Sequence, residues 1–155
     1  MPLYGDWNIL SMKLKTLHKS LTPHLTARLY ENGELVLNTM IEHIENQDLD
    51  WSPLSENTIR LKGNDTIYKE TGFLVDNLVL EKVQPKFNEI AVFIGFSNTK
   101  VHEPSGLKFC ELMVMLEYGT SKMPPRPLVR PTWEETQKLV RKNLENAISE
   151  ILSKK

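Results

Sequence analysis

The chain has 155 residues, of which 40% are apolar and 25% are charged, and its formal net charge is −1. That length suits a single domain spanning residues 1–155, and the composition excludes a largely disordered chain. A single cysteine excludes an intrachain disulfide and a cysteine-based structural zinc site. The absence of a basic excess argues against a nucleic-acid coat protein.

No apolar run approaches the ~20 residues needed to cross a bilayer, and the first residues lack a leader's basic and apolar regions. We therefore expect no membrane contact and synthesis in a reducing cytoplasm. The charge is uneven: residues 1–50 hold four basic and seven acidic residues (−3), residues 51–125 hold eight and nine (−1), and residues 126–155 hold seven and four (+3). These charges either lie on ordinary solvated helix faces, or the negative and positive segments pair with each other within one chain or between copies.

The first 48 residues predict N-terminal helices. Four leucines share one helical face: Leu10, Leu14, Leu17 and Leu21. Asp6 is placed to cap the start of this helix. Proline is favoured in the first turn of a helix but not inside one, so we expect a second helix to begin at Pro23 and to end near residues 46–48. Gly33 costs that helix about 1 kcal/mol relative to alanine, which marks a point for a kink or break.

Residues 50–72 predict a long loop with a short helical turn after Ser55, and long loops of this kind tend to be functional or mobile. Residues 73–96 predict a strand hairpin region, because branched and aromatic residues at 78–83 and 90–96 flank a turn-forming segment. Polar residues 97–107 predict a second loop.

Residues 107–155 predict a helix, a proline-rich arm and a C-terminal helix. The apolar stretch 107–118 favours a buried helix ended by Gly119, with a strand as the alternative. Apolar spacing predicts the last helix over residues 132–152. The fold class expected from this order is α+β, with a small antiparallel sheet packed by the N-terminal and C-terminal helices.

The sequence lacks the signatures of P-loop, dinucleotide-binding, nucleophile-elbow and zinc-protease sites. His43 lies among acidic residues, where a solvated helix face is favoured over a metal site. Cys110 has no basic neighbour except Lys108, which favours a small buried hydrophobe over a nucleophile. A hydrolase would need convergent acids around His43 or His102. We therefore expect no enzyme, no catalytic residue, no metal and no cofactor.

A basic cluster at Lys138, Arg141 and Lys142 falls at i, i+3 and i+4, so these residues share one helix face. A nucleic-acid-binding accessory protein using this face is the alternative function. No aromatic residue is interleaved among them and acidic residues lie nearby, so direct DNA contact is disfavoured.

The segment 117–131 is unusual, because Gly119 permits a positive-φ turn and several prolines then hold an extended arm. The arm would present Arg126 and Arg130 just ahead of the last helix. On physical grounds alone, a rigid connector between two helices is the favoured interpretation.

This segment closely resembles a motif of the tail-completion and neck proteins of long-tailed bacteriophages, including the Mu-type virion morphogenesis family. The resemblance lies in Glu117-Tyr118-Gly119-Thr120 followed by Pro124-Pro125-Arg126-Pro127-Leu128-Val129-Arg130-Pro131. A looser match is Trp51-Ser52-Pro53-Leu54 with Thr58, followed by Thr71-Gly72-Phe73-Leu74. In the family, the element that contains Thr-Gly usually begins with an apolar residue, and residues 67–70 depart from this pattern. The whole resemblance covers roughly residues 50–150.

The resemblance implies a structural virion protein at the head–tail junction, present in the host cytoplasm during assembly. Such proteins complete the tail or join it to the head connector, commonly as homo-oligomeric rings of six copies, with the tail terminator or tube and the connector proteins as partners. Loops 50–72 and 97–107 would become ordered on assembly. The residues implied in contact roles are Glu117, Tyr118, Gly119, Thr120, Pro125, Arg126, Pro127 and Arg130.

Overall fold

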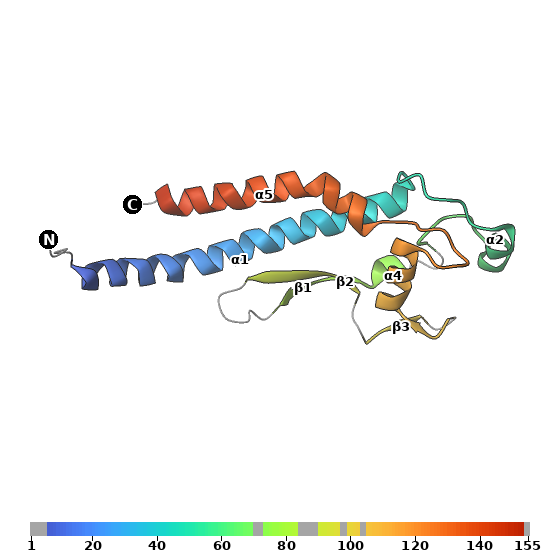
Figure 1. The fold of residues 1–155 in the computed structure, drawn as a ribbon, viewed down its shortest axis with the longest axis horizontal. Helices are drawn as coiled ribbons and strands as arrows, with labels where there is room; N and C mark the ends of the chain where they lie inside the picture. Colours follow the sequence, from blue (N-terminus) through green and yellow to red (C-terminus); the bar gives the residue numbers. More distant parts are fainter. Residues whose placement is uncertain (1–5, 70–72, 84–89, 97–98, 103–104, 154–155) are drawn as a thin grey trace.

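The computed structural model describes residues 6–69, 73–83, 90–96, 99–102 and 105–153. Two long helices, α1 (Trp7–Asn46) and α5 (Val129–Ser153), lie side by side and give the molecule an elongated shape (Figure 1). An antiparallel pair of strands, β1 (Leu78–Val83) and β2 (Ala91–Phe96), packs against α1. The expected α+β class, a small antiparallel sheet packed by the N-terminal and C-terminal helices, is confirmed.

Helix α1 runs without interruption for 40 residues, so the predicted new helix at Pro23 is wrong. Proline removes one backbone hydrogen bond, but the helix surface around Pro23 is largely open to water, which can hydrate the carbonyl that loses its partner. The predicted cap at Asp6 is confirmed, because its carboxylate accepts a hydrogen bond from the Ile9 amide at 3.3 Å. Among the described residues, no helix is both long and apolar enough to cross a membrane.

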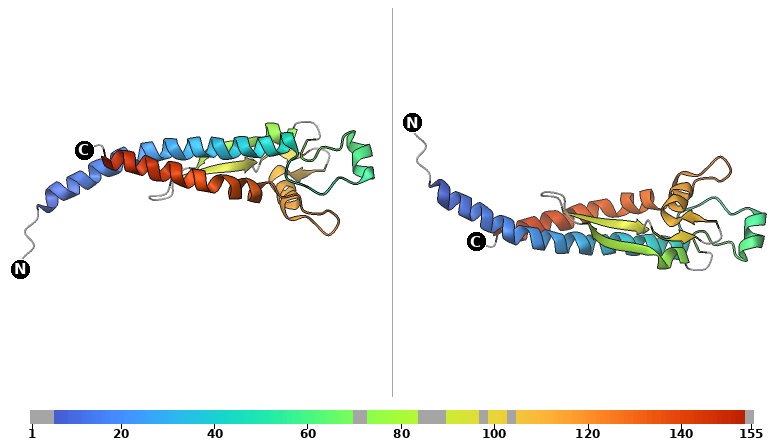
Figure 2. Two further views of the ribbon diagram at one scale, coloured as in Figure 1. Left: turned by 90° about the horizontal axis from the view of Figure 1, so that it is seen from above. Right: turned by 90° about the horizontal axis from the view of Figure 1, so that it is seen from below.

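The first part of α1 extends beyond the rest of the molecule. Figure 2 shows it turning away from the direction of the remaining helix and reaching past the end of α5. The last turns of α5 lie opposite the middle of α1, where the Glu150 carboxylate is 3.6 Å from His24 Nε2 and 3.7 Å from Arg28 Nη2. Residues 7–21 of α1, here called the overhang, therefore lie beyond the part of the helix that α5 covers.

Gly33 does not break α1 but lets the sheet approach it closely. A Cβ atom on this buried glycine would lie 2.6 Å from Leu80 Cδ1 and 3.5 Å from Val92 Cγ2. The absent side chain therefore makes room for β1 and β2 to pack on the helix.

The predicted hairpin is confirmed, with Leu78 paired to Phe96 and Val83 to Ala91 at the two ends of the register. A short helix, α3 (Phe73–Asp76), precedes it, and the predicted turn at residues 84–89 lies outside the described residues. The segment predicted as a loop over 97–107 instead holds a second small antiparallel pair, β3 (Val101–His102) with β4 (Leu107–Lys108).

The other short elements follow the sequence closely. Helix α2 (Glu56–Lys62) begins at the predicted Ser55 cap, whose hydroxyl accepts from the Thr58 amide at 3.2 Å. Helix α4 (Phe109–Tyr118) ends at Gly119 as predicted. The core lies where α1 ends and α5 begins, and its buried members are Met40, Ile44, Ile67, Tyr68, Phe96, Phe109, Met113 and Leu128.

Candidate interaction site

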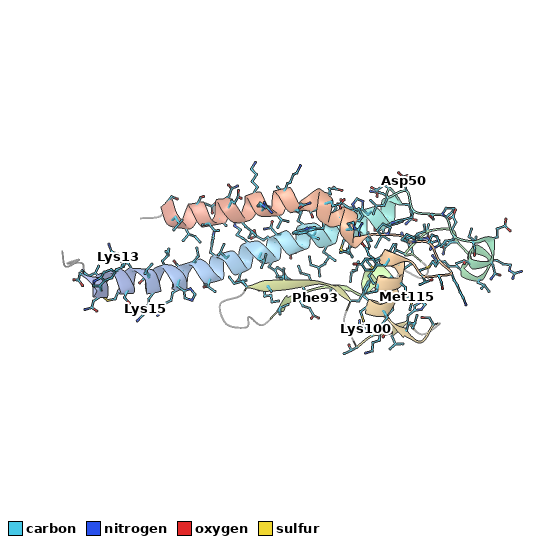
Figure 3. All side chains as sticks on the ribbon, viewed as in Figure 1. Lys13, Lys15, Asp50, Phe93, Lys100 and Met115 are labelled. Atoms are coloured by element: carbon cyan, nitrogen blue, oxygen red, sulfur yellow. The ribbon has the colours of Figure 1, made fainter. Side chains whose placement is uncertain are left out.

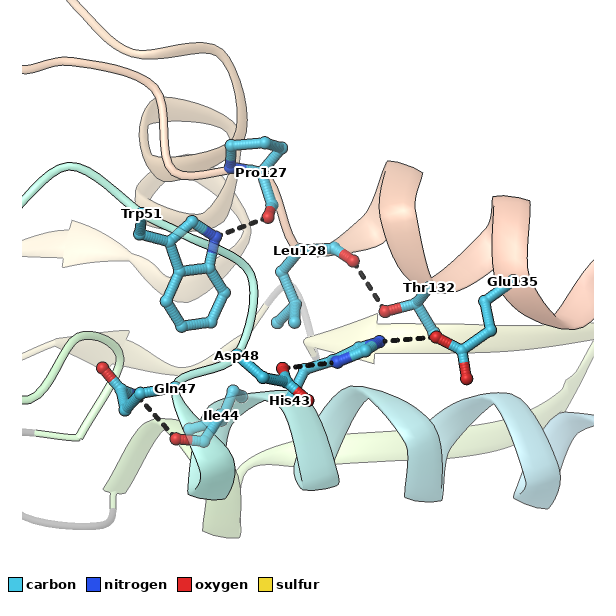
Figure 4. Close-up of polar contacts among 9 residues, drawn as sticks. All are labelled: His43, Ile44, Gln47, Asp48, Trp51, Pro127, Leu128, Thr132 and Glu135. Carbon is cyan, nitrogen blue, oxygen red and sulfur yellow. Dashed lines mark hydrogen bonds and ion pairs between the residues drawn. The ribbon is translucent and has the colours of Figure 1, made fainter.

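Two segments that lie about 75 residues apart in the sequence meet at the start of α5. The Trp51 indole donates a hydrogen bond to the Pro127 carbonyl at 2.7 Å (Figure 4). Arg126 Nε donates to the Ser52 carbonyl at 2.8 Å, and its Nη2 donates to the Pro53 carbonyl at 3.0 Å. We call this contact of residues 51–53 with residues 126 and 127 the loop joint.

Tyr68 closes the loop joint from a third segment. Its hydroxyl donates to the Arg126 carbonyl at 2.5 Å, and its ring lies 5.0 Å from the Trp51 ring. Burial raises the pKa of the Tyr68 phenol well above its usual value; the Glu117 charge raises it further and the Arg126 charge partly offsets this. The backbone of Tyr68 lies in the left-handed region, at φ 64°, which a bulky residue rarely adopts, so the buried contacts of the ring hold this conformation.

Arg126 was expected to be exposed on the arm, but the structure buries its side chain. It is only 4% exposed, because its guanidinium is turned into the chain toward residues 52 and 53. Its amide donates to the Leu116 carbonyl at 2.7 Å. Arg126 therefore holds the chain's own loop against the end of α4, and that expectation is corrected.

Glu117 is also used within the chain. Its carboxylate accepts hydrogen bonds from the amides of Leu128, Val129 and Arg130 at 2.7, 2.9 and 3.0 Å. A negative charge at a helix N-terminus satisfies amides that lack intrahelical partners and opposes the positive end of the helix dipole. This cap explains why α5 begins at Val129 rather than at the predicted residue 132, with Pro131 tolerated in its first turn.

Gly119 and Thr120 shape the turn that follows α4. Gly119 has φ 74°, and a Cβ atom there would lie 2.8 Å from the Pro125 nitrogen and 2.9 Å from the Met123 carbonyl oxygen. Thr120 closes the turn by donating its amide to that same carbonyl at 2.8 Å. Only glycine fits the first position without displacing backbone.

The remaining expected contact residues are more open. Tyr118 is 71% exposed, Pro125 and Arg130 are exposed, and Pro127 is half-buried. Tyr118 and Arg130 line a shallow surface groove between α4 and the start of α5, here called the α4–α5 groove. Its lining residues are Met113, Val114, Glu117, Tyr118, Val129, Arg130 and Trp133.

Sequence patterns alone did not identify Trp133 and Val114 as residues of a contact surface. Trp133 is 50% exposed and Val114 is 57% exposed, and both face the α4–α5 groove. The one available signal was that Trp133 falls outside the apolar stripe that predicts the core face of α5. An exposed tryptophan beside exposed aliphatic residues marks an apolar contact surface rather than a solvated one.

His43 is buried rather than on the solvated face that the sequence favoured. Its Nδ1 lies 2.8 Å from an Asp48 carboxylate oxygen, and its Nε2 lies 3.3 Å from a Glu135 carboxylate oxygen (Figure 4). Glu135 comes from α5, so this imidazole links the last turns of α1 to the first turns of α5. The sequence had no signal for this contact, because Glu135 lies 92 residues further along the chain.

Gln47 fastens the same end of α1 to the core. Its side-chain amide donates to the Ile44 carbonyl at 2.6 Å (Figure 4) and to the Ile67 carbonyl at 2.9 Å. Its side-chain oxygen accepts from the Ile67 amide at 2.8 Å. These bonds bring residue 67, and with it Tyr68, against the loop joint.

The other candidates from the sequence lie apart from this site. Cys110 is half-buried in α4, and His102 Nδ1 is 2.8 Å from the Ser105 hydroxyl. Lys138, Arg141 and Lys142 line one exposed stretch of α5. Across the ranges that the structure describes, no three His, Cys, Asp or Glu side chains are grouped as metal ligands.

Comparison of the chain with models of protein families, with curated proteins and with solved structures found no match in any of the three.

Proposed function

We propose that the chain is a structural protein of the head–tail junction of a long-tailed bacteriophage. In this role it completes the tail or joins it to the head connector, as a ring of copies that contacts the tail terminator or tube and the connector. Its place is the virion, after assembly in the host cytoplasm.

The loop joint carries the proposal. The two separate motifs on which the family resemblance depends are the Trp51 segment and the Arg126 segment, and they bond directly to each other. A chance match of two short motifs has no reason to coincide with one structural unit. A shared joint would explain why both motifs occur, in this order, in one family.

The exposed apolar surfaces add support. The α4–α5 groove and the overhang each carry several exposed large apolar side chains. Contiguous apolar surface of this kind typically marks contacts with other proteins. A component of a virion junction needs such surfaces on more than one side.

A deletion of the gene in the phage or prophage that encodes the chain tests the proposal. Electron microscopy of the lysate is expected to show heads and tails that are not joined, and the wild-type chain supplied in trans is expected to restore complete virions. Normal virions from the deletion strain would refute the proposed role.

One exposed residue allows a sharper version of the experiment. Arg130 is exposed and holds the Glu117 cap only through its amide, so Arg130→Glu is expected to fold normally yet fail to restore joined virions. Arg126 is unsuitable for this purpose, because its buried bonds make any substitution a test of folding.

A second candidate function rests on the exposed basic stretch of α5. Lys138, Arg141 and Lys142 lie together on one exposed surface, beside Glu145, and three basic side chains so placed suit contact with phosphates. A DNA titration over a range of salt concentrations is expected to give a log–log slope of about −2.7 if all three meet phosphate. A flat titration would eliminate this function and leave the first untouched.

A further inference from the structure

The overhang of α1 continues a helix-packing seam beyond the point where α5 ends. Five apolar residues recur at alternating spacings of three and four, which is the pattern of a helix that packs against another element: Trp7, Leu10, Leu14, Leu17 and Leu21. The next positions of this seam, His24 and Arg28, contact Glu150 of α5. The seam is therefore covered from residue 24 onward, half-buried at Leu17 and Leu21, and exposed from Leu14 back to Trp7.

The uncovered seam leaves large apolar side chains in water. Trp7 is 64% exposed, Leu10 46% and Leu14 56%, and neighbouring Met12 is 61% exposed. The hollow along this surface is lined by residues of the overhang alone, so no described residue from another segment covers it. A second helix-sized surface is required to remove these side chains from water.

The charges of the overhang show what kind of surface it fits. Residues 7–21 carry Lys13, Lys15 and Lys19 and no acidic residue. Figure 3 shows Lys13 and Lys15 at the far end of the molecule from Asp50, which lies beyond the last turn of α1. Two overhangs paired with each other would bring these lysines together, so a pair of overhangs is disfavoured.

The α4–α5 groove has the complementary properties. It is apolar through Val114, Val129 and Trp133, which are 57%, 46% and 50% exposed. The charged residues of its lining are Glu117 and Arg130. The helix segments around it, α4 and residues 129–135, add Glu111, Glu134 and Glu135, so the local charge of this region is −3. Helix α4 and the start of α5 lie far along the molecule from the N-terminal part of α1 (Figure 1), so one chain cannot bring its own overhang to its own groove.

We propose that the overhang of one copy docks in the α4–α5 groove of a second copy. The contact joins two different surfaces, so each added copy leaves one overhang and one groove open, and the series closes into a ring when the rotation per copy permits. This inference deepens the proposed ring of the head–tail junction and rests on that proposal.

Two variants of the full chain test the contact from its two sides. The overhang variant is Leu10→Gln with Leu14→Gln, and the groove variant is Val114→Gln with Trp133→Gln. Glutamine is neutral and favours helices, so both variants lose apolar surface without a change of charge or a loss of helix propensity. Leu61→Gln on α2 is the matched control, because Leu61 is 78% exposed and lies in neither surface.

Sedimentation over a wide concentration range is expected to show assembly of the wild-type chain and of the Leu61→Gln control. Each double variant alone is expected to associate about 100-fold more weakly, because two apolar side chains no longer become buried. An equal mixture of the two variants retains one intact overhang and one intact groove. It is expected to form a two-copy species of twice 17.9 kDa and nothing larger.

Several results would overturn the inference, with thermal melts by circular dichroism confirming that each variant is folded. If both double variants assemble like the wild type, the ring uses other surfaces, and the proposed function stands. If the groove variant assembles normally while the overhang variant does not, the overhang pairs elsewhere. If the mixture gives no two-copy species, or the wild-type chain is monomeric at every concentration, the contact does not exist; the deletion strain then decides the proposed function separately.

Discussion

Replacement of Tyr68 by phenylalanine isolates the energetic role of one hydroxyl in the loop joint. The substitution keeps the buried ring beside Trp51 and removes only the 2.5 Å hydrogen bond to the Arg126 carbonyl. A buried carbonyl that loses its donor costs about 1–1.5 kcal/mol. We therefore expect the unfolding free energy of Tyr68→Phe to be lower by about this amount at pH 7, with a midpoint shift of about 2–5 °C for a chain of this length.

The Tyr68 hydroxyl also makes the difference in unfolding free energy between the wild type and Tyr68→Phe depend on pH. Burial raises the pKa of Tyr68 in the folded chain above the value near 10 of the unfolded chain. The stability that this group contributes is complete below pH 10 and falls as the pH rises above 10, because only the unfolded state then releases the proton. One pH unit above 10 the loss is about 1.4 kcal/mol, so the wild-type advantage over Tyr68→Phe should nearly vanish by pH 11.

Urea unfolding at pH 7, 9, 10 and 11 measures this difference, with Tyr118→Phe as the control. Tyr118 is 71% exposed, so its substitution should not change the midpoint at pH 7. In an absorbance titration of the folded protein up to pH 11, Tyr68→Phe should lose no titrating phenol. A gap between wild type and Tyr68→Phe that stays constant from pH 7 to 11 would refute the reasoning, as would equal stability at pH 7.

Three other substitutions test the joint by the same urea measurement. Glu117→Gln should cost about 1–2 kcal/mol by weakening the charged cap on three amides of α5, whereas exposed Glu134→Gln should cost less than half as much; equal effects would contradict the cap. Gly119→Ala should destabilise by more than Gly63→Ala, because both positions have positive φ but only the first would place Cβ against backbone; similar losses would show that the close approach is unimportant. Arg126→Met should cost about 2–4 kcal/mol, since it leaves two carbonyls without donors, and a neutral result would place its guanidinium outside the joint.

The sequence predicted those elements whose signals are local. The hairpin over 78–96, the Ser55 cap and the end of α4 at Gly119 all depend on residues within a few positions of each other. The sequence rule for Pro23 concerns one backbone hydrogen bond, and the carbonyl that loses its donor lies on a part of α1 that is largely open to water. One lost bond on an exposed helix surface does not outweigh the bonds that α1 keeps on both sides of Pro23.

The position of the interaction site in the sequence was predictable, but the roles of its individual residues were not. The arm at 117–131 was recognised as unusual, yet the burial of Arg126 and of His43 depends on residues 52, 53 and 135 that no local pattern connects to them. Trp133 lies outside the apolar stripe of α5, which indicates an exposed side chain, but it cannot be assigned to a contact surface until the position of α4 is known.

Some residues of the arm bond within their own chain and others are exposed, and only the exposed ones are candidates for contacts with other proteins. Glu117, Gly119 and Arg126 bond or fit closely to other parts of their own chain, so their positions in this segment are explained by folding. That leaves the exposed positions beside them, above all Tyr118 and Arg130, which face the α4–α5 groove. The residues of this motif are therefore better explained as structural supports of the α4–α5 groove, which we propose as the surface that contacts a partner.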